Sequence, residues 1–320
     1  TQVSAYPAVV VIRRGEQGLV STVDTTDQLN RDGGRELAAW LIDRPSSPQK
    51  GDGWHGSVLP GWFETDGVWP TGSASKLEWL ADLEHRFCPL ELPDKRTILR
   101  IGVATGNDAV FVVSENQAQQ FEDSRLLPLA MNDDVKSGEF RWGQRFLIDP
   151  WEKRAQLIDF ADYPLTSAYL HRHKAALAGR HTARNGDWWR TIDAVHRDRL
   201  QHPYLVLEDM KGHAHPVKIP AGYYPHHALY AIYSDAWDLD VLGGILMSEV
   251  FESQVAAYCV KMRGGTLRFQ AQYIRLCRFP RPEDISTDVA RDLASAFTSR
   301  DRALATKAAL EAYGMTEIPE

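Results

Sequence analysis

The chain has 320 residues, of which 43% are hydrophobic and 25% charged, and its formal net charge is −7. This composition is that of an ordinary water-soluble globular protein with one large domain or two modest ones. No apolar run approaches the roughly 20 residues that cross a bilayer, so we expect no transmembrane helix and no membrane partner. The cysteines, Cys88, Cys259 and Cys277, form no Cys-x-x-Cys pair. This spacing argues against a thiolate zinc site and a disulfide scaffold and favours a reducing cytoplasm.

The N-terminal region begins with an apolar run. Ala8 to Ile12 is mostly β-branched, which predicts a strand buried on both faces. The residues before it lack the order of a signal peptide and suggest a strand already under way, so we expect more chain upstream in the natural protein. Residues 18–26 can pair back as a hairpin. Helical spacing of apolar residues predicts a helix from Arg31 to Asp43.

The next segment, residues 46–72, is rich in Pro, Gly and Trp and has little periodicity, which predicts a linker. Ser73 or Ser75 is expected to cap a helix that continues to about Cys88. Its apolar face is formed by Leu77, Leu80, Leu83 and Phe87.

Residues 97–113 predict a strand, a turn at Thr105 to Asp108, and a second strand. A nucleotide-binding glycine loop is the alternative. Gly102 and Gly106 do not make the dinucleotide fingerprint, and no helix is expected after the turn. Further strands are expected at 146–148, 204–207 and 228–233, and helices at 163–177, 239–260 and 284–313.

Two stretches carry an excess of cations within an acidic chain. The first runs from Arg172 to Arg190, where Asp187 is the only acid and Trp188-Trp189 precedes the last arginine. Its cations are Arg172, Lys174, Arg180, Arg184 and Arg190. Cations interleaved with aromatic rings suit phosphates and stacked bases. The alternative is a solvated helix surface with two core tryptophans.

The second basic stretch is Val260 to Pro280, which lies in a segment without an acid between Glu252 and Glu283. Gly264-Gly265 permits a sharp turn or close approach of a partner. The cations are Lys261, Arg263, Arg268, Arg275 and Arg278. A basic turn before an aromatic segment suits a polyanion such as a nucleic-acid backbone. The alternative is a solvated charged loop.

Two other groups of residues are candidate chemical sites. His213, His215, His226 and His227 can form a metal cluster, although they lack acids or thiols at ligand spacing and turn histidines are the simpler interpretation. Glu208-Asp209 is an adjacent acidic pair, and neighbouring strand residues face opposite ways, so these carboxylates are not expected to converge. The chain contains no Gly-x-Ser-x-Gly, Walker loop or His-Glu-x-x-His motif.

A series of short pieces, in order over residues 75–280, resembles one protein family. They are Gly102 to Asn107 with Phe111; Leu127-Pro128-Leu129 with Asn132-Asp133; Tyr163-Pro164 with Tyr169-Leu170 and Leu177 to Arg180; Trp188-Trp189; and Leu242 to Val250 followed by Arg263-Gly264-Gly265 and Arg268-Phe269. Together they resemble the C-terminal half of adenine-specific DNA methyltransferases of restriction–modification systems. The resemblance is to the TaqI-type specificity domain, which also occurs in large restriction–methylase fusions.

The resemblance implies an α+β fold, a mixed sheet and helix target-recognition domain with an incomplete N-terminal remnant of an α/β methyltransferase domain. Residues 1–45 would be the end of the catalytic domain and 46–72 a linker. Residues 73–282 would form the DNA target-recognition domain and 283–320 a C-terminal helical tail.

The family's catalytic domain binds S-adenosylmethionine through a glycine-rich loop and reaches the flipped adenine with an Asn-Pro-Pro-aromatic loop. Neither loop occurs in this chain. The resemblance therefore implies no catalytic residue, no metal and no cofactor here, and S-adenosylmethionine only in the full-length enzyme. The implied partners are double-stranded DNA and an upstream methyltransferase domain, in the cytoplasm. The candidate DNA-binding residues are Thr105, Gly106, Asn107, Arg141, Arg184, Trp188, Arg190, Lys261, Arg263, Gly264, Gly265, Arg268, Gln270 and Gln272.

Two other functions remain open from the residues. A small-molecule transferase would use the Thr105-Gly106-Asn107 turn. A protein-interaction module would use the tryptophan-rich segment from Trp54 to Trp69.

Overall fold

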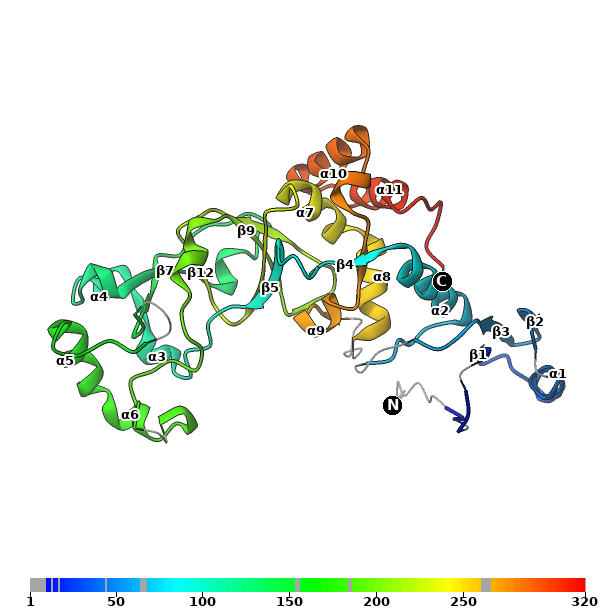
Figure 1. Cartoon of the computed structure of the whole chain (residues 1–320), viewed down its shortest axis with the longest axis horizontal. Helices are drawn as coiled ribbons and strands as arrows, with labels where there is room; N and C mark the ends of the chain where they lie inside the picture. The colour runs from blue at the N-terminus through cyan, green and yellow to red at the C-terminus, as the bar shows by residue number, and fades with distance from the viewer. Residues whose placement is uncertain are drawn as a thin grey trace. The chain divides into compact units, whose positions relative to one another are not determined.

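The structure is a computed structural model, which describes residues 10–12, 14–16, 18–43, 45–63, 68–152, 156–183, 186–259 and 266–319 (Figure 1). The chain divides into two compact units, residues 1–85 with 319–320, and residues 86–318.

The first unit is built on a three-stranded antiparallel sheet with the order β1-β3-β2. Its elements are β1 (Val20–Thr25), α1 (Arg31–Ile42), β2 (Gln49–Gly51), β3 (Trp54–Leu59) and α2 (Ala74–Arg86), the last of which ends at the unit boundary. Trp40 of α1 packs on Trp54, with ring centroids 5.5 Å apart. Gly56 of β3 lies beneath the Trp40 ring, where an added Cβ would be 2.5 Å from a ring carbon.

The structure corrects three expectations for this unit. Val10 to Ile12 lie in no strand, and Val11 is 91% exposed, so the described part of the predicted buried strand is neither paired nor covered. Residues 20–25 pair with β3 instead of folding back on the opening run. The predicted linker contains β2 and β3, because the aromatic side chain of Trp54 and the missing side chain of Gly56 let this segment pack against α1.

The second unit contains two four-stranded sheets. One has the order β11-β9-β13-β5 and is antiparallel throughout. The other has the order β12-β7-β8-β6 and is antiparallel except for the β12–β7 pair. Two further pairs are β10-β14 and β15-β4. The strands are β4 (Cys88–Pro89), β5 (Thr97–Ile101), β6 (Val112–Ser114), β7 (Leu126–Ala130), β8 (Arg145–Ile148), β9 (Tyr204–Glu208), β10 (Met210–Lys211), β11 (Val217–Ile219), β12 (Tyr224–Pro225), β13 (Leu229–Ser234), β14 (Leu267–Arg268) and β15 (Arg278–Phe279).

Helices occur between these strands and after them. They are α3 (Asp108–Phe111), α4 (Glu115–Ala118), α5 (Pro164–Arg172), α6 (Lys174–Ala178), α7 (Leu239–Met247), α8 (Glu249–Tyr258), α9 (Ala271–Ile274), α10 (Thr287–Ser299) and α11 (Arg302–Ala312). One core packs the second sheet against Tyr169, Leu170 and Leu177 of α5 and α6. Small sheets mixed irregularly with helices make this an α+β fold, as predicted.

The α7, α10 and α11 helices pack together, as the orange and red helices beside α7 show (Figure 1). Gly244 of α7 allows this packing, because an added Cβ would lie 2.3 Å from the Leu293 carbonyl oxygen of α10. None of the described helices is both long and apolar enough to span a membrane.

Several predicted elements of the second unit are confirmed, and others are corrected. The strands near 146–148, 204–207 and 228–233 and the helix that begins at Pro164 all occur, whereas β7 was not predicted. The long helix expected over 239–260 is two helices, because Ser248 adopts an extended conformation and its Oγ accepts a hydrogen bond from the Phe251 N–H. The strands β5 and β6 belong to different sheets, and the one-turn helix α3 lies between them.

Candidate DNA interface

The turn at Thr105 to Asn107 is held by its own side chains. Gly106 has φ of +76°, a left-handed conformation that favours glycine. The Thr105 hydroxyl is buried, accepts a hydrogen bond from the Asn107 N–H at 3.1 Å, and donates to the Asp108 carboxylate. These hydrogen bonds within the chain hold the conformation of the turn, and no bound ligand is needed for them to form.

A second segment, residues 188–193, is fastened to this turn. The Arg180 guanidinium donates hydrogen bonds to the carbonyl oxygens of Thr105 (2.9 Å), Trp188 (2.8 Å) and Arg190 (2.7 Å). Asp193 accepts from the Ala104 N–H at 2.9 Å and donates its own N–H to the Ala104 carbonyl. The structure therefore brings together Thr105, Gly106, Asn107, Trp188 and Arg190, five of the predicted site residues that are far apart in sequence.

Trp188 and Arg190, the two predicted site residues of this segment, both contact other side chains of the protein. Trp188 is half-buried against Phe160 and His171, and the Lys174 ammonium lies 5.3 Å from its ring centroid. The Arg190 guanidinium lies 5.2 Å from the Trp151 ring centroid. The rings of this segment pack on one another at tilted or edge-on angles, and Lys174 and Arg190 lie over rings of the same chain.

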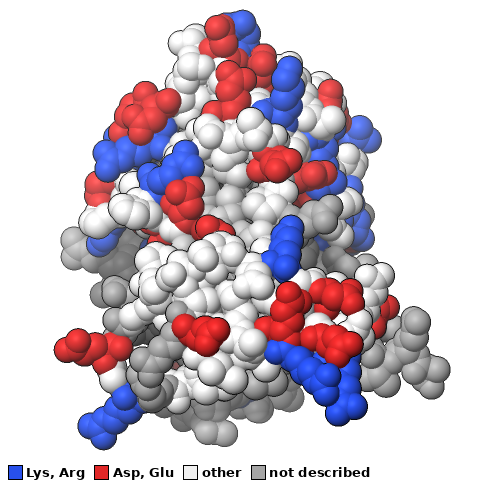
Figure 2. Space-filling model, turned by 90° about the vertical axis from the view of Figure 1, so that its right-hand side faces the viewer, with Lys and Arg blue, Asp and Glu red and all other residues white. Residues whose placement is uncertain are grey.

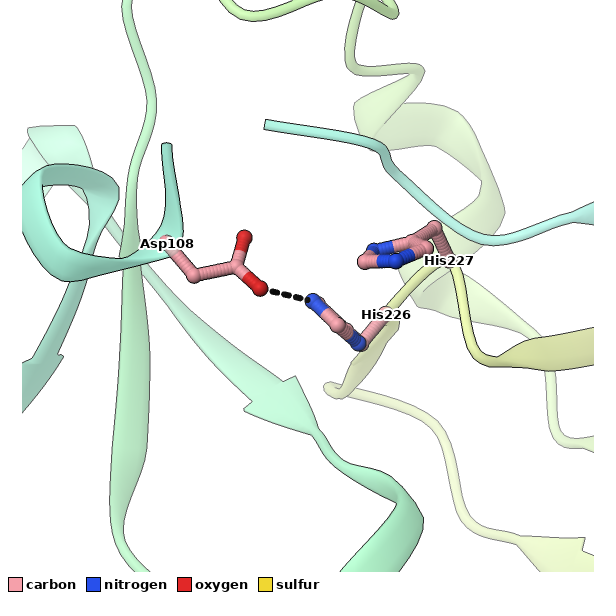
Figure 3. A group of neighbouring side chains, drawn as sticks. All are labelled: Asp108, His226 and His227. Carbon is pink, nitrogen blue, oxygen red and sulfur yellow. Dashed lines mark hydrogen bonds and ion pairs between the residues drawn. The ribbon is translucent and has the colours of Figure 1, made fainter. Parts of the chain in front are cut away.

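The neighbouring loops carry an unexpected Asp–His group. His226 Nε2 lies 3.0 Å from Asp108 Oδ2, and the exposed His227 ring lies against His226 with centroids 4.1 Å apart (Figure 3). Burial and His227 lower the pKa of His226, whereas Asp108 raises it. Burial raises the pKa of Asp108, but hydrogen bonding from Thr105 and the charge of His226 outweigh burial and lower it overall.

These three side chains offer ligand atoms within 4.8 Å of one another, close enough for one metal ion. A metal on His226 Nε2 would place the ring proton on Nδ1, which is buried and has no hydrogen-bond partner among the described residues. Metal-bound histidines almost always donate that proton to a neighbour. We therefore interpret the group as a hydrogen-bonded clasp between the start of α3 and the loop that joins β12 to β13. The histidine cluster, which was the less favoured alternative, is not found among the described residues, since His213 instead faces Glu252.

The described part of the second basic stretch forms a two-stranded ribbon with β10, in which Arg268 is opposite Met210. Arg268 donates from Nε to Asp209 Oδ1 at 2.9 Å and from Nη2 to Asp209 Oδ2 at 2.6 Å. Gln270 Nε2 donates to the same Asp209 Oδ2 at 3.3 Å, and Gln272 Nε2 donates to Gln270 Oε1 at 3.2 Å. One carboxylate thus organises three of the predicted site residues.

The remaining predicted residues fall into two groups. Arg141 is a surface residue whose guanidinium pairs with Glu139 at 3.0 Å. Arg184, Lys261, Arg263, Gly264 and Gly265 lie outside the described residues. On the face drawn in Figure 2, Lys and Arg side chains lie among Asp and Glu side chains instead of forming one basic field. A surface on which both signs are mixed presents a weaker field to a distant polyanion than a surface of one sign.

Sequence reasoning did not find the acids that organise these sites. Asp209 was considered only as a partner of Glu208, and the two do point to different partners: Glu208 pairs with Lys211 and Asp209 with Arg268. Asp108, Asp193 and Asp209 each contact residues that are distant in sequence. A local pattern gives no signal for such contacts.

No family model matches the chain. It is 34% identical over 291 residues to the type II methyltransferase M.BstVI of Geobacillus stearothermophilus, covering 90% of this chain and 52% of that protein. It is 35% identical over 320 residues to the type II methyltransferase M.PaeR7I of Pseudomonas aeruginosa, covering 99% of this chain and 54% of that protein. It is also 37% identical over 251 residues to the type II methyltransferase M.XhoI of Xanthomonas vasicola, covering 78% and 45%.

The fold is similar to that of the Type IIL restriction-modification enzyme MmeI, whose structure was determined in complex with DNA. The TM-score is 0.50 at 11% sequence identity, with 93% of this chain and 47% of that chain covered. At this identity the likeness concerns the fold alone. The sequence matches carry the relationship: over most of its length the chain is homologous to type II DNA methyltransferases, and it spans about half the length of the curated relatives it matches.

Proposed function

We propose that this chain is the DNA target-recognition part of an adenine-specific DNA methyltransferase of a restriction–modification system. The observation that supports this most is the identity of 34–37% to type II methyltransferases, over 78–99% of this chain but only about half of theirs. We assign recognition to residues 73–282, the helical tail to 283–320, and residues 1–72, which hold the β1-β3-β2 sheet, to the end of a catalytic domain that lies mostly upstream.

The catalytic chemistry is assigned to another part of the larger protein. The chain contains no Asn-Pro-Pro sequence. The turn at Gly106 does not suit a cofactor phosphate or carboxylate, because Thr105 Oγ1 already accepts the Asn107 N–H and the Asn107 carbonyl accepts those of Val110 and Phe111. We propose that S-adenosylmethionine is bound only in the full-length enzyme and by other residues.

Recognition would use two groups of residues with different tasks. Cations of the two basic stretches would neutralise phosphates and fix the register on the duplex. Arg268, Gln270 and Gln272 would reach base edges, since arginine pairs with guanine and glutamine with adenine. A further, preformed contact with DNA would be made by the turn from Thr105 to Asn107 together with the segment that contains Trp188 and Arg190. Binding by both groups would help the catalytic domain extrude its target adenine.

Fluorescence anisotropy with a labelled duplex at low salt tests this proposal. We expect saturable binding of the chain to the duplex. With S-adenosylmethionine in calorimetry we expect no measurable heat, and with radiolabelled S-adenosylmethionine no transfer of methyl groups to DNA. Absence of DNA binding by the folded chain would contradict the recognition role. Saturable micromolar binding of the cofactor would contradict the assignment of catalysis to another part.

A further inference from the structure

Asp209 lies in the bend between β9 and β10 and holds Arg268 from one side only. The two hydrogen bonds use Nε and Nη2 of the guanidinium, at 2.9 and 2.6 Å. The other terminal nitrogen, Nη1, has no hydrogen-bond partner among the described residues. Because a guanidinium is planar and carries five N–H groups, this pairing leaves the edge formed by Nη1 and Nη2 as two parallel donors.

That edge has the geometry of guanine recognition. Guanine presents two neighbouring acceptors, O6 and N7, in the major groove, and arginine binds them with two parallel N–H groups. We propose that Asp209 is a positioning residue that fixes Arg268 so that its free edge reads one guanine. The inference rests on the proposed DNA-recognition function and adds to it the residue that sets the orientation and the base that is selected.

The backbone around the pair is fixed by the core. Phe269, between Arg268 and Gln270, is fully buried and stacks on Phe251 with ring centroids 6.0 Å apart. Its N–H donates to the Asp209 carbonyl oxygen at 2.7 Å. Because neighbouring residues of an extended segment point to opposite sides, burial of Phe269 directs Arg268 and Gln270 outward. The same contacts place Asp209 beside them.

The charge of the pair argues against a simple phosphate contact. Asp209 neutralises Arg268, and its own negative charge repels a phosphate. Stability is a poor reason for the pair as well, because the side chains are only 28% and 25% exposed and the cost of desolvating a partly buried ion pair offsets much of its attraction. The pair weakens the attraction of Arg268 for phosphate and adds little stability. Both are understandable if the role of the pair is to fix the direction of the Arg268 guanidinium. Gln270, bonded to the same carboxylate, would be oriented with it.

Selection from a pool of duplexes with a randomised central segment tests the inference with this 320-residue chain. The variants are Asp209→Asn, which cannot accept both hydrogen bonds, and Arg268→Ala. The matched control is Asp288→Asn, which removes one charge and one Arg–Asp pair on the surface of α10, with Arg291. We expect the wild-type chain to select guanine at one position. Both test variants should lose that preference, with roughly 10- to 100-fold weaker binding to the selected site and nearly unchanged binding to random duplex.

The outcomes separate the inference from the proposed function. If the wild-type chain selects no sequence, both fail. If it selects a sequence and Asp209→Asn selects the same one, or loses selectivity at a different position from Arg268→Ala, the proposed function stands and the positioning role is wrong. Should circular dichroism show that Asp209→Asn is unfolded, Arg268→Lys replaces it. Lysine keeps the charge but has no two-donor edge, so retention of wild-type selectivity by this variant would overturn the inference.

Discussion

The turn around Gly106 and the ribbon of β10 and β14 each depend on one arginine from a basic stretch. At the turn, Arg180 donates hydrogen bonds to four main-chain carbonyl oxygens, those of Leu177, Thr105, Trp188 and Arg190. At the ribbon, Arg268 is bonded to a single carboxylate and keeps one edge free of described partners. The first arginine joins segments of its own chain, whereas the second is oriented toward the outside. An excess of cations in a sequence therefore does not identify which of them face a partner.

The largest expected effect comes from removing the arginine at the turn. Arg180→Ala leaves the carbonyls of Thr105, Trp188 and Arg190 without their donor in a partly buried place, so we expect a loss of about 2–4 kcal/mol in the free energy of unfolding. Urea denaturation measures it. The matched control is Arg141→Ala, whose guanidinium is 74% exposed and pairs only with Glu139 among the described residues, and which should cost less than about 0.5 kcal/mol. Equal losses of unfolding free energy in both variants would show that Arg180 contributes no more to stability than the surface cation Arg141.

Local signals in the sequence predicted single elements well. Ser73 caps α2 by accepting the Lys76 N–H at 3.2 Å, and Pro164 begins α5, as expected. The break at Ser248 was missed because the apolar stripe continues across it, from Leu246 to Val250. The segment 46–72 was predicted as a linker because Trp54 and Gly56, which pack against Trp40 of α1, follow no periodic spacing.

The candidate site was only partly predictable for a different reason. Thr105, Trp188 and Arg268 were named from composition and resemblance, but the acids that hold these regions come from far along the chain. Asp209 and Arg268 are 59 residues apart, and Asp108 and His226 are 118 apart. Such contacts depend on which strands pair, and the pairing of β13 with β5 and β9 is not encoded in any single segment.

A smaller effect is expected from pH at the clasp beside the turn. The pKa of His226 in the folded protein lies below its ordinary value of 6.5, chiefly because the ring is buried, so the unfolded state binds more protons near that pH. Stability should therefore be fully present above about pH 6.5 and fall as the pH drops through 6.5 toward the lowered pKa. Urea denaturation across this window, for wild type and His226→Asn, measures the slope.

The variant should have a shallower dependence on pH than the wild type. It should keep part of the slope, because burial also lowers the pKa of His196 and His215. His202→Asn, which removes an exposed histidine, is the control for loss of an imidazole. Identical slopes for wild type and His226→Asn would show that protonation of His226 does not lower the free energy of unfolding. The hydrogen bond between His226 and Asp108 would then not help to hold the turn.

The smallest effect concerns charge alone and compares two arginines of the same basic stretch. Arg263 lies outside the described residues, so only its charge enters the argument. If it lies beside a phosphate, Arg263→Ala should flatten the slope of log affinity against log salt by roughly 0.9, with a change in stability within about 0.5 kcal/mol. Arg268→Ala should leave that slope nearly unchanged on random duplex, because Asp209 already neutralises the guanidinium. Anisotropy titrations of one random duplex at several salt concentrations measure both. An unchanged slope for a folded Arg263→Ala chain would mean that this cation is solvated surface, whereas a flattened slope for Arg268→Ala would mean that its ion pair opens on DNA and that Arg268 binds phosphate instead of a base.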